Sequence, residues 1–513
     1  QLFHSLGSWV PQDMVSKPAH YNTPEWDKML LHIFREAEEK DMQIAVLSAP
    51  FWDIDGGPWV ELEDAMKILV HTEQIVGGGR LNNIQLSQPL TRESYYRDVA
   101  CLALPALSND ASLAQGVEVF SSSKFYQDKP FGFNGQSLIV QAGDKAEGGD
   151  YIDFVFSQPT DISYMSLHQG SGVKFKVECT VQFFDQNNNS VGNEVSFGTN
   201  CKASRPFYAS NLETVQSSRV RLQFARSIPK DLSGFDLRGE AGIHNLHLKN
   251  GSGYPHGHGN GIAKKNQFEE RGFVNESAGI ALDEVIDLTD ALDDQGRLNA
   301  ELPQGNWRVI RIGYTFNGKY THGSKNEPYM TVDKLSPSGV AVNYSNLVGR
   351  IVKMARAEGI EHQPMAIYAE SYESKTQNWT QRMPEEFEAR RGYSLKPYLP
   401  VLCGGYVMGS FDESERFLRD FRRTIADLMA ENYMGERTRL AHKDGLRSYG
   451  DNGGAQQFMY DAVNYQKQVD VPIGEFWVQS KREVEAEYPH YSIRQDIKNG
   501  SSAVHIYNEI VPE

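Results

Sequence analysis

The sequence predicts an α/β fold whose parallel sheet, either a (β/α)8 TIM-like barrel or doubly wound, is interrupted by an inserted antiparallel β-sandwich. Three observations support this. A continuous apolar run, Met42–Ala49, follows a helical pattern near the start. Short alternating strands fill the stretch from about Asp110 to Asn250, without a convincing helix. Past Val340 helices and strands alternate to the end, which is typical of a parallel sheet.

The first β/α unit begins with a helix over Thr23–Asp41, with Thr23 as N-cap and a proline in the first turn. The apolar run Met42–Ala49 is typical of a strand buried on both faces. A loop rich in Gly, Pro and Trp follows, and we expect a helix over Leu62–Val70.

In the inserted region, runs such as YIDFVF and VKFKVECTVQFF are separated by turns of the type DQNNNS, a pattern that favours an antiparallel sandwich. Cys179 and Cys201 lie in this region and are expected either to pair or to remain two buried thiols. A second strand-rich stretch, Val285–Tyr314, follows a Gly/His-rich segment that resembles a flexible joint.

The C-terminal part alternates regularly. We expect helices over Asn343–Glu358, Pro384–Gly392 and Glu413–Asp444, a helix through Tyr465 and another to about Val504. We expect strands over Met365–Glu370, Leu446–Gly450, Val471–Trp477 and Ile506–Val511.

These patterns divide the chain into four parts. We expect residues 1–105 to form the first part of the barrel, and residues 106–250 the inserted sandwich. Residues 251–340 form a linker and a second β-rich segment, and residues 341–513 the remainder of the barrel. Because the first unit begins with a helix and the last strand reaches Glu513, we expect a barrel that is incomplete at both ends.

Composition excludes several classes of protein. The 51 Lys and Arg against 67 Asp and Glu leave a net charge of −16, which disfavours a nucleic-acid partner. The longest apolar runs fall far short of the roughly 20 residues of a membrane span. The N-terminus shows no charged region before an apolar core, so we expect any signal peptide to have been removed or to lie upstream. We expect a periplasmic or secreted bacterial protein.

Acidic residues recur at or just beyond the ends of the predicted strands: Asp53, Asp55, Glu370, Glu373, Asp451, Glu475 and Glu513. A single carboxylate in such a place is more often a helix N-cap or a surface charge. In a barrel, however, all these loops converge on the catalytic face. Trp52, Trp59, Trp379 and Trp477 fall in the same loops.

Two carboxylates across a cleft are what glycosidic cleavage requires, because one protonates the leaving oxygen and the other activates water or attacks the sugar. The four tryptophans would supply flat apolar faces for a sugar. No GxSxG, GxxxxGK[ST], HExxH or strand-linked GxGxxG motif occurs. The residues therefore favour a carbohydrate substrate.

Several segments resemble glycoside hydrolase family 106, the α-L-rhamnosidases. They occur in the family's order: FWDIDGGPWV, AMKILV, SYESKTQNWT, FEARRGYSLKPYLPVL, ERFLRDFRRTIADLMAENY, VPIGEFW and AVHIYNEIVPE. The resemblance implies a (β/α)8 catalytic barrel interrupted by β-domains, inverting hydrolysis of terminal α-L-rhamnosides, and a bound calcium ion. The inserted region resembles a galactose-binding-like jelly roll.

The resemblance also implies roles for residues. Glu373, Glu475 and Glu513 match active-site glutamates of the family. We expect Glu373 to be the general acid, Glu513 the base, or the reverse, and Glu475 to bind sugar or orient water. Asp55, Glu370, Asp451 and Asn452 are expected to help bind the substrate, together with the four tryptophans. The calcium ligands are not assigned.

Three departures from the family pattern keep other functions open. Glu370 replaces the more usual Asp, Asp451 stands where a glutamate is common, and Glu513 lies in a shorter turn. The alternatives are a non-catalytic carbohydrate-binding protein and a glycosidase for another deoxy-sugar or a uronic acid.

Overall fold

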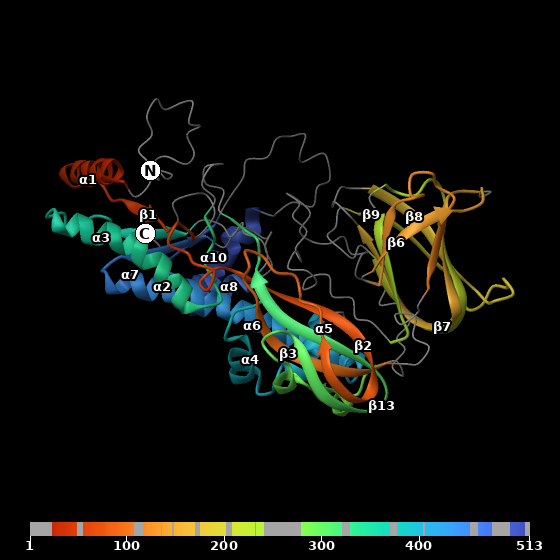
Figure 1. Ribbon diagram of the computed structural model, residues 1–513. Coiled ribbons are helices and arrows are strands. Elements are labelled where there is room, and N and C mark those ends of the chain that lie inside the picture. The colour runs from red at the N-terminus through yellow and green to blue at the C-terminus, as the bar shows by residue number, and fades with distance from the viewer. Residues whose placement is uncertain are drawn as a thin grey trace.

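The computed structural model describes fourteen stretches of the chain and contains three β-sheets (Figure 1). The described residues are 23–48, 55–106, 116–134, 136–145, 148–169, 175–201, 208–230, 232–240, 279–320, 329–369, 377–403, 406–451, 460–474 and 493–507.

The first sheet is parallel and carries the candidate site. Its strands are β1 (Ala45–Leu47), β14 (Ala366–Ala369), β15 (Arg447–Asp451) and β16 (Val471–Ile473), and they lie side by side in chain order. In register, Leu47 pairs with Tyr368, Tyr368 with Tyr449, and Tyr449 with Val471. Neighbours in chain order are what repeated β/α units produce, and they agree with the parallel sheet that the sequence predicts.

The described helices lie before, between and after these strands in the chain. They are α1 (Pro24–Glu39), α2 (Pro337–Asn346), α3 (Val348–Ala357), α4 (Met383–Arg391), α5 (Leu399–Cys403), α6 (Phe411–Leu428), α7 (Glu436–Lys443), α8 (Ala462–Gln466) and α10 (Ile493–Tyr507). The expected N-cap of α1 is confirmed, because the Thr23 hydroxyl accepts the backbone N–H of Trp26 at 3.3 Å. The expected helix over Glu413–Asp444 is α6 and α7, joined by a π-helical turn, η8 (Met429–Gly435).

The last expected strand is wrong where it is described. Ile506 and Tyr507 lie at the end of α10, and residues 508–513 are outside the described part of the chain. The described part of the chain also contains the short 3₁₀ turns η5 (Leu282–Glu284), η6 (Thr289–Ala291) and η7 (Lys396–Tyr398).

The second sheet is antiparallel, in the order β12 (Ile286–Asp287), β3 (Arg97–Ala106), β13 (Arg297–Phe316) and β2 (Lys67–Gln85). The helix expected over Leu62–Val70 is wrong, because Lys67 to Val70 begin the long strand β2. Four buried residues in a row there fit either structure, and pairing with β13 decides it. Residues 67–106 thus join the second β-rich segment in one sheet.

The inserted domain is an eight-stranded sheet. In the order along the sheet its strands are β11 (Leu232–Arg238), β5 (Pro130–Phe133), β6 (Gln136–Ala142), β4 (Glu118–Ser121), β7 (Tyr151–Gln169), β10 (Tyr208–Phe224), β8 (Phe175–Phe184) and β9 (Val195–Cys201). An additional β7–β11 pairing closes five of them into a ring. The expectation of a purely antiparallel domain is wrong in two places, since β4 pairs with β6 and β5 with β11 in parallel.

The disulfide considered for this domain does not form. Cys179 is a buried free thiol opposite Phe197, whereas Cys201 pairs in register with Phe175. The two cysteines therefore lie on neighbouring strands but out of register. Among the described residues, no helix is both long and apolar enough to cross a membrane.

Candidate active site

The candidate site lies at the carboxyl edge of the parallel sheet. Ala369 pairs with Gly450, and Asp451 with Ile473, so β14, β15 and β16 end next to one another. In the sequence, Glu370 follows Ala369 directly and Asn452 follows Asp451. Loops at the carboxyl ends of parallel strands are the usual place for ligands in α/β folds. The edge is thus the place from which the predicted acidic loops begin.

Four of the predicted site residues are described: Asp55, Trp59, Trp379 and Asp451. The others, namely Trp52, Glu370, Glu373, Asn452, Glu475, Trp477 and Glu513, lie outside the described residues.

Asp451 is the last residue of β15 and is almost fully buried. Alternate side chains of a strand point to opposite faces of its sheet. Ser448 faces α7, since its hydroxyl bonds with that of Thr438 at 2.8 Å. Tyr449 and Asp451 therefore point to the face opposite α7.

A half-buried tyrosine pair lies on this same face. Tyr368 and Tyr449 are neighbours in register, and the guanidinium of Arg447 lies 5.8 Å from the Tyr449 ring centroid. Aromatic side chains beside a carboxylate suit a sugar, which presents both C–H faces and hydroxyl groups. Sequence reasoning missed this pair, although each tyrosine stands two residues before a predicted acidic site residue.

The helical layer packs tightly behind the end of β15. A Cβ atom on Gly450 would lie 2.8 Å from the Met434 Cε atom and 2.9 Å from the Val469 Cγ1 atom. Met434 belongs to the π-helical turn η8, and such turns often occur at functional sites. Glycine at position 450 thus allows η8 to approach the strand next to Asp451.

A substrate ligand should be accessible from solvent, but only 1% of Asp55 is exposed. The pKa of its carboxyl group is raised, because the effect of burial outweighs the opposing charges of Arg437 and Lys334. The hydroxyl groups of Ser48 and Tyr433 lie beside the same carboxyl group. The structure thus makes Asp55 part of a buried polar cluster rather than of a sugar-binding surface.

The two tryptophans of the predicted site that are described differ in burial. Trp59 is half-buried, and its indole N–H donates to Asn343 Oδ1 at 3.1 Å. Trp379 is fully buried in the main hydrophobic core, and its backbone pairs with Lys67 of β2. The expectation that Trp379 stacks on a sugar is corrected, because its ring has no exposed face.

Sequence reasoning also missed the buried cations Arg437 and Lys334. Arg437 lies four residues after Tyr433, on the apolar stripe that continues from α6 into α7. A charged residue within such a stripe was the available signal, because charged residues are almost never fully buried unless they are paired.

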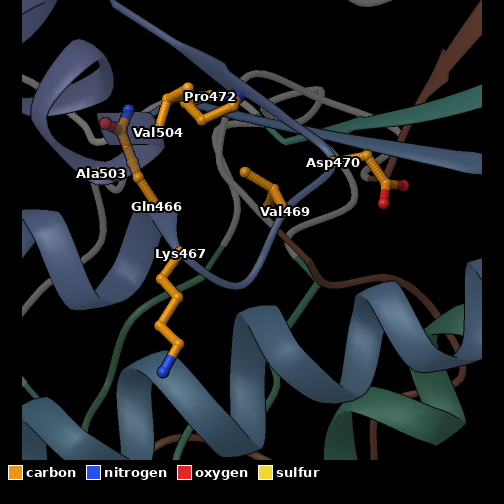
Figure 2. Close-up of a pocket in the computed structure, with 7 residues that line it drawn as sticks. All are labelled: Gln466, Lys467, Val469, Asp470, Pro472, Ala503 and Val504. Atoms are coloured by element: carbon orange, nitrogen blue, oxygen red, sulfur yellow. The ribbon is translucent and has the colours of Figure 1, made fainter. Parts of the chain in front are cut away.

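A separate hollow lies near the parallel sheet but away from the candidate site (Figure 2). It is lined by Gln466, Lys467, Val469, Asp470, Pro472, Ala503 and Val504, from α8, α10 and the amino end of β16. Asp470 is engaged there, accepting the backbone N–H of Ser448 at 2.7 Å and lying 2.9 Å from His442. The hollow is therefore on the helix side of the sheet, away from its carboxyl edge.

The described residues do not form a calcium site. Within the described ranges, no three His, Cys, Asp or Glu side chains gather closely enough to hold a metal ion. Asp55 faces two cationic side chains, which would repel Ca²⁺. The calcium ion implied by the family resemblance therefore remains a prediction.

Comparison with known proteins identifies the class as glycoside hydrolase. Residues 6–511 match the family-106 profile, described as alpha-L-rhamnosidase. The chain belongs to glycoside hydrolase family 106.

Two relatives give the context. A protein of Formosa agariphila, provisionally named a beta-glucuronidase, is 27% identical over 432 residues, covering 84% of this chain and 25% of that protein. The structure of a rhamnosidase from Novosphingobium sp. PP1Y superposes with a TM-score of 0.76 at 24% identity, covering 99% of this chain and 48% of that chain. The latter similarity shows a shared fold. The chain thus spans about a quarter and about half of these two proteins.

Proposed function

We propose that this chain carries the catalytic region of an inverting exo-α-L-rhamnosidase that removes terminal rhamnose from polysaccharides or glycosides. The observation that supports it most is the parallel sheet, whose strands β14, β15 and β16 end side by side immediately before acidic loops. The same chain-order arrangement of four parallel strands supports a (β/α)8 barrel as the complete catalytic fold.

In this proposal Glu373 protonates the glycosidic oxygen as the aglycone leaves. Glu513 removes a proton from a water molecule that attacks the anomeric carbon from the opposite side. Glu475 binds the sugar or orients that water. An inverting enzyme needs roughly 6.5–9.5 Å between the two carboxyl groups to accommodate the water, whereas about 5–5.5 Å would favour retention.

The described residues support sugar binding at the same edge. Tyr368 and Tyr449 provide a half-buried aromatic surface, and the buried Asp451 lies on the same face. Asp55 stays out of contact with the substrate in this proposal, because it is buried behind the edge.

The test is hydrolysis of an α-L-rhamnoside with an alkyl aglycone, whose leaving oxygen needs protonation, by the protein and by Glu373→Gln. Loss of the general acid should lower kcat by about 10²–10⁴-fold or more. Glu358→Gln is the matched control, because Glu358 is an exposed glutamate at the end of α3. NMR of the first product formed should show the inverted anomer. Near-normal turnover by Glu373→Gln would contradict the assignment.

A second candidate is a glycosidase for a uronic acid, favoured by the provisional name of the Formosa agariphila relative. A panel of aryl α-L-rhamnosides and β-D-glucuronides separates the two. Binding of rhamnose without turnover of any member of the panel would instead support a non-catalytic carbohydrate-binding protein. The periplasmic or secreted location stays a prediction that cell fractionation tests.

A further inference from the structure

The turn between β4 and β5, in the inserted domain, carries an exposed aromatic ring. Phe125 lies in this turn and is 37% exposed, and it meets the buried Tyr126 edge to face with 5.1 Å between the ring centroids. In Figure 1, strands β6 to β9 of this domain lie on the opposite side of the molecule from β1, α1 and α3. A single exposed apolar residue is ordinary on a protein surface, so the surroundings of the ring decide whether it has a role.

Two lysines flank this ring. The Lys129 Nζ atom lies 3.7 Å from the Phe125 ring centroid, and the Lys230 Nζ atom lies 5.3 Å from it. Both lysines are exposed, and among the described residues neither forms an ion pair. Residues 122–129 and Lys230 hold three lysines against one carboxylate, that of Asp128, in a chain with a net charge of −16. Asp231 lies outside the described residues. The described surroundings of the ring are thus cationic on an acidic protein.

Hydrogen bonds hold the segments of the two lysines together. The Tyr126 hydroxyl donates to the carbonyl oxygen of Leu232 at 3.0 Å and also contacts that of Pro229, so it binds the backbone on both sides of Lys230. The Tyr126 carbonyl oxygen accepts the backbone N–H of Lys129 at 3.2 Å. A surface that is fixed in advance loses less conformational entropy when a ligand binds. The buried tyrosine next to the exposed ring therefore prepares this surface for a ligand.

A flat ring beside two ammonium groups matches an acidic sugar. The C–H face of a pyranose packs on an aromatic ring, and a carboxylate pairs with an ammonium group. A uronic acid offers both within one residue, because its carboxylate is attached to a ring carbon. An exposed cation–π contact is weak and the lysine stem is flexible, so an ammonium group can leave the ring for a carboxylate. A neutral sugar would leave both ammonium groups without a counter-charge.

We propose that Phe125, Lys129 and Lys230 form a binding site for the uronic acid residues of an acidic polysaccharide. The site lies on the inserted domain and not on the parallel sheet, so it holds the polymer without taking part in the reaction. A second contact of this kind raises the effective concentration of the polymer at the candidate active site. Only this last consequence rests on the proposed function.

Binding of the full chain to polygalacturonate and to alginate tests the site without reference to activity. Affinity electrophoresis in gels that contain each polymer gives the dissociation constants, and hydroxyethylcellulose is the neutral comparison. We expect Phe125→Ala and the double variant Lys129→Gln/Lys230→Gln each to weaken binding to at least one of the two acidic polymers. The loss should be about 2- to 10-fold, the effect of one stacked ring or of two exposed ion pairs. The loss in the lysine variant should shrink as salt is added, because salt screens exposed charges.

Two control variants separate the site from general effects. Lys28→Gln/Lys353→Gln removes the same charge from exposed positions on α1 and α3, and it should bind both acidic polymers as the wild type does. Phe125→Tyr keeps the ring and should also keep the binding. Equal weakening by the two double lysine variants would overturn the proposal, because the overall charge would then explain the binding. Thermal denaturation should show that every variant is folded, since the substituted side chains are exposed.

Dextran sulfate distinguishes a sulfate group from a carboxylate. Binding to dextran sulfate but to neither uronic acid polymer, weakened by the same substitutions, would overturn the assignment to uronic acids. Failure of the wild type to bind either uronic acid polymer would overturn the site as a whole. If the wild type binds one of them but has no rhamnosidase activity, the proposed function fails while the binding site stands.

Discussion

Arg308 of β13 and Glu240, just after β11, form a buried ion pair with 3.3 Å between Nη2 and Oε1, and each side chain is 5% exposed. The same guanidinium lies 3.3 Å from Glu73 of β2, whose carboxylate accepts the Tyr406 hydroxyl at 2.7 Å. The guanidinium of Arg238, from β11, lies 4.3 Å from the centroid of the Tyr406 ring. These charges join the inserted domain to the second sheet.

Removing Arg308 should strongly destabilise the protein. Arg308→Met leaves Glu240 and Glu73 with uncompensated charge, and breaking one partner of a buried pair costs about 3–5 kcal/mol. Urea denaturation measures the loss.

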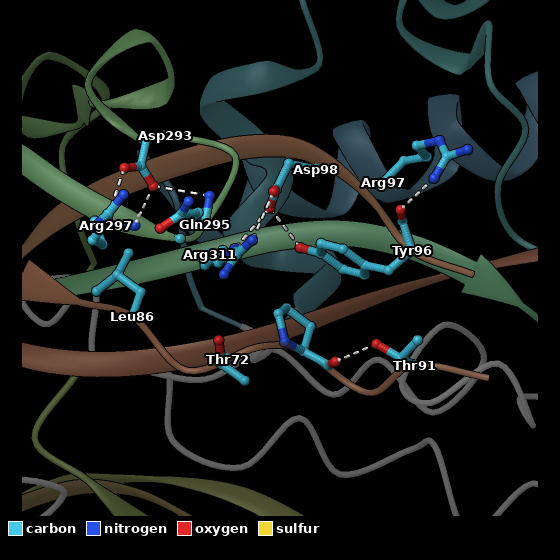
Figure 3. Close-up of polar contacts among 12 residues, drawn as sticks. Thr72, Leu86, Thr91, Tyr96, Arg97, Asp98, Asp293, Gln295, Arg297 and Arg311 are labelled. Carbon is cyan, nitrogen blue, oxygen red and sulfur yellow. Dashed lines mark hydrogen bonds and ion pairs between the residues drawn. The ribbon is translucent and has the colours of Figure 1, made fainter. Parts of the chain in front are cut away.

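Arg297→Met is the control for that experiment, because Arg297 lies on the same strand in a more exposed pair with Asp293, 2.9 Å apart (Figure 3). It should cost less than about 1 kcal/mol. Equal losses of stability in Arg308→Met and Arg297→Met would show that burial of the Arg308 pair does not increase its effect on stability.

Glu73 should make stability depend on pH. Burial raises its pKa, but the hydrogen bond with His71 and the charges of Arg308 and Arg238 outweigh burial and hold the pKa well below its usual range. A depressed folded-state pKa gives stability that is present above the unfolded value, about 4.3, and is lost as pH falls towards the folded value.

The free energy of unfolding should therefore differ more between wild type and Glu73→Gln at pH 6 than at pH 3. Equilibrium denaturation at several pH values checks this. A difference that stays constant over this range would mean that Glu73 contributes through its shape and not through its charge.

Trp379 should behave as a core residue. Because its ring is fully buried, Trp379→Ala should cost about 3–5 kcal/mol of stability. Trp59→Ala should cost less, since Trp59 is half-buried. Thermal denaturation and rhamnose binding should be measured together. If Trp379→Ala has normal stability but no longer binds sugar, the prediction that Trp379 stacks on a sugar would stand.

Gly450 should resist even a methyl group. Gly450→Ala places a Cβ atom 2.8 Å from Met434 Cε, and overpacking of this kind costs about 1–3 kcal/mol. Gly77→Ala is the control, because no atom lies within 4 Å of the new Cβ atom there. The double variant Gly450→Ala/Met434→Ala should lose less stability than the two single losses summed. A loss of stability in the double variant equal to the sum of the two single losses would argue against a contact between Met434 and the new methyl group.

Periodicity determined much of the fold in advance. The N-cap at Thr23, the strand at Met365–Glu370 and the helix at Pro384–Gly392 all agree with the structure, because each depends on local capping or on one buried face. The error at Leu62–Val70 has a physical reason. A short run buried on every side has no period, and only its partner strand β13 makes it a strand.

Local sequence also predicted where acidic loops would lie, since strand ends can be recognised from apolar runs. It could not tell which of their side chains are buried. Asp55 and Trp379 look like ligands in the sequence, but they are enclosed by Arg437, by Lys334 and by a core assembled from distant segments. The pattern of residues thus determined the family and the parallel sheet. Burial and charge pairing, which depend on contacts between segments hundreds of residues apart, were decided only by the tertiary structure.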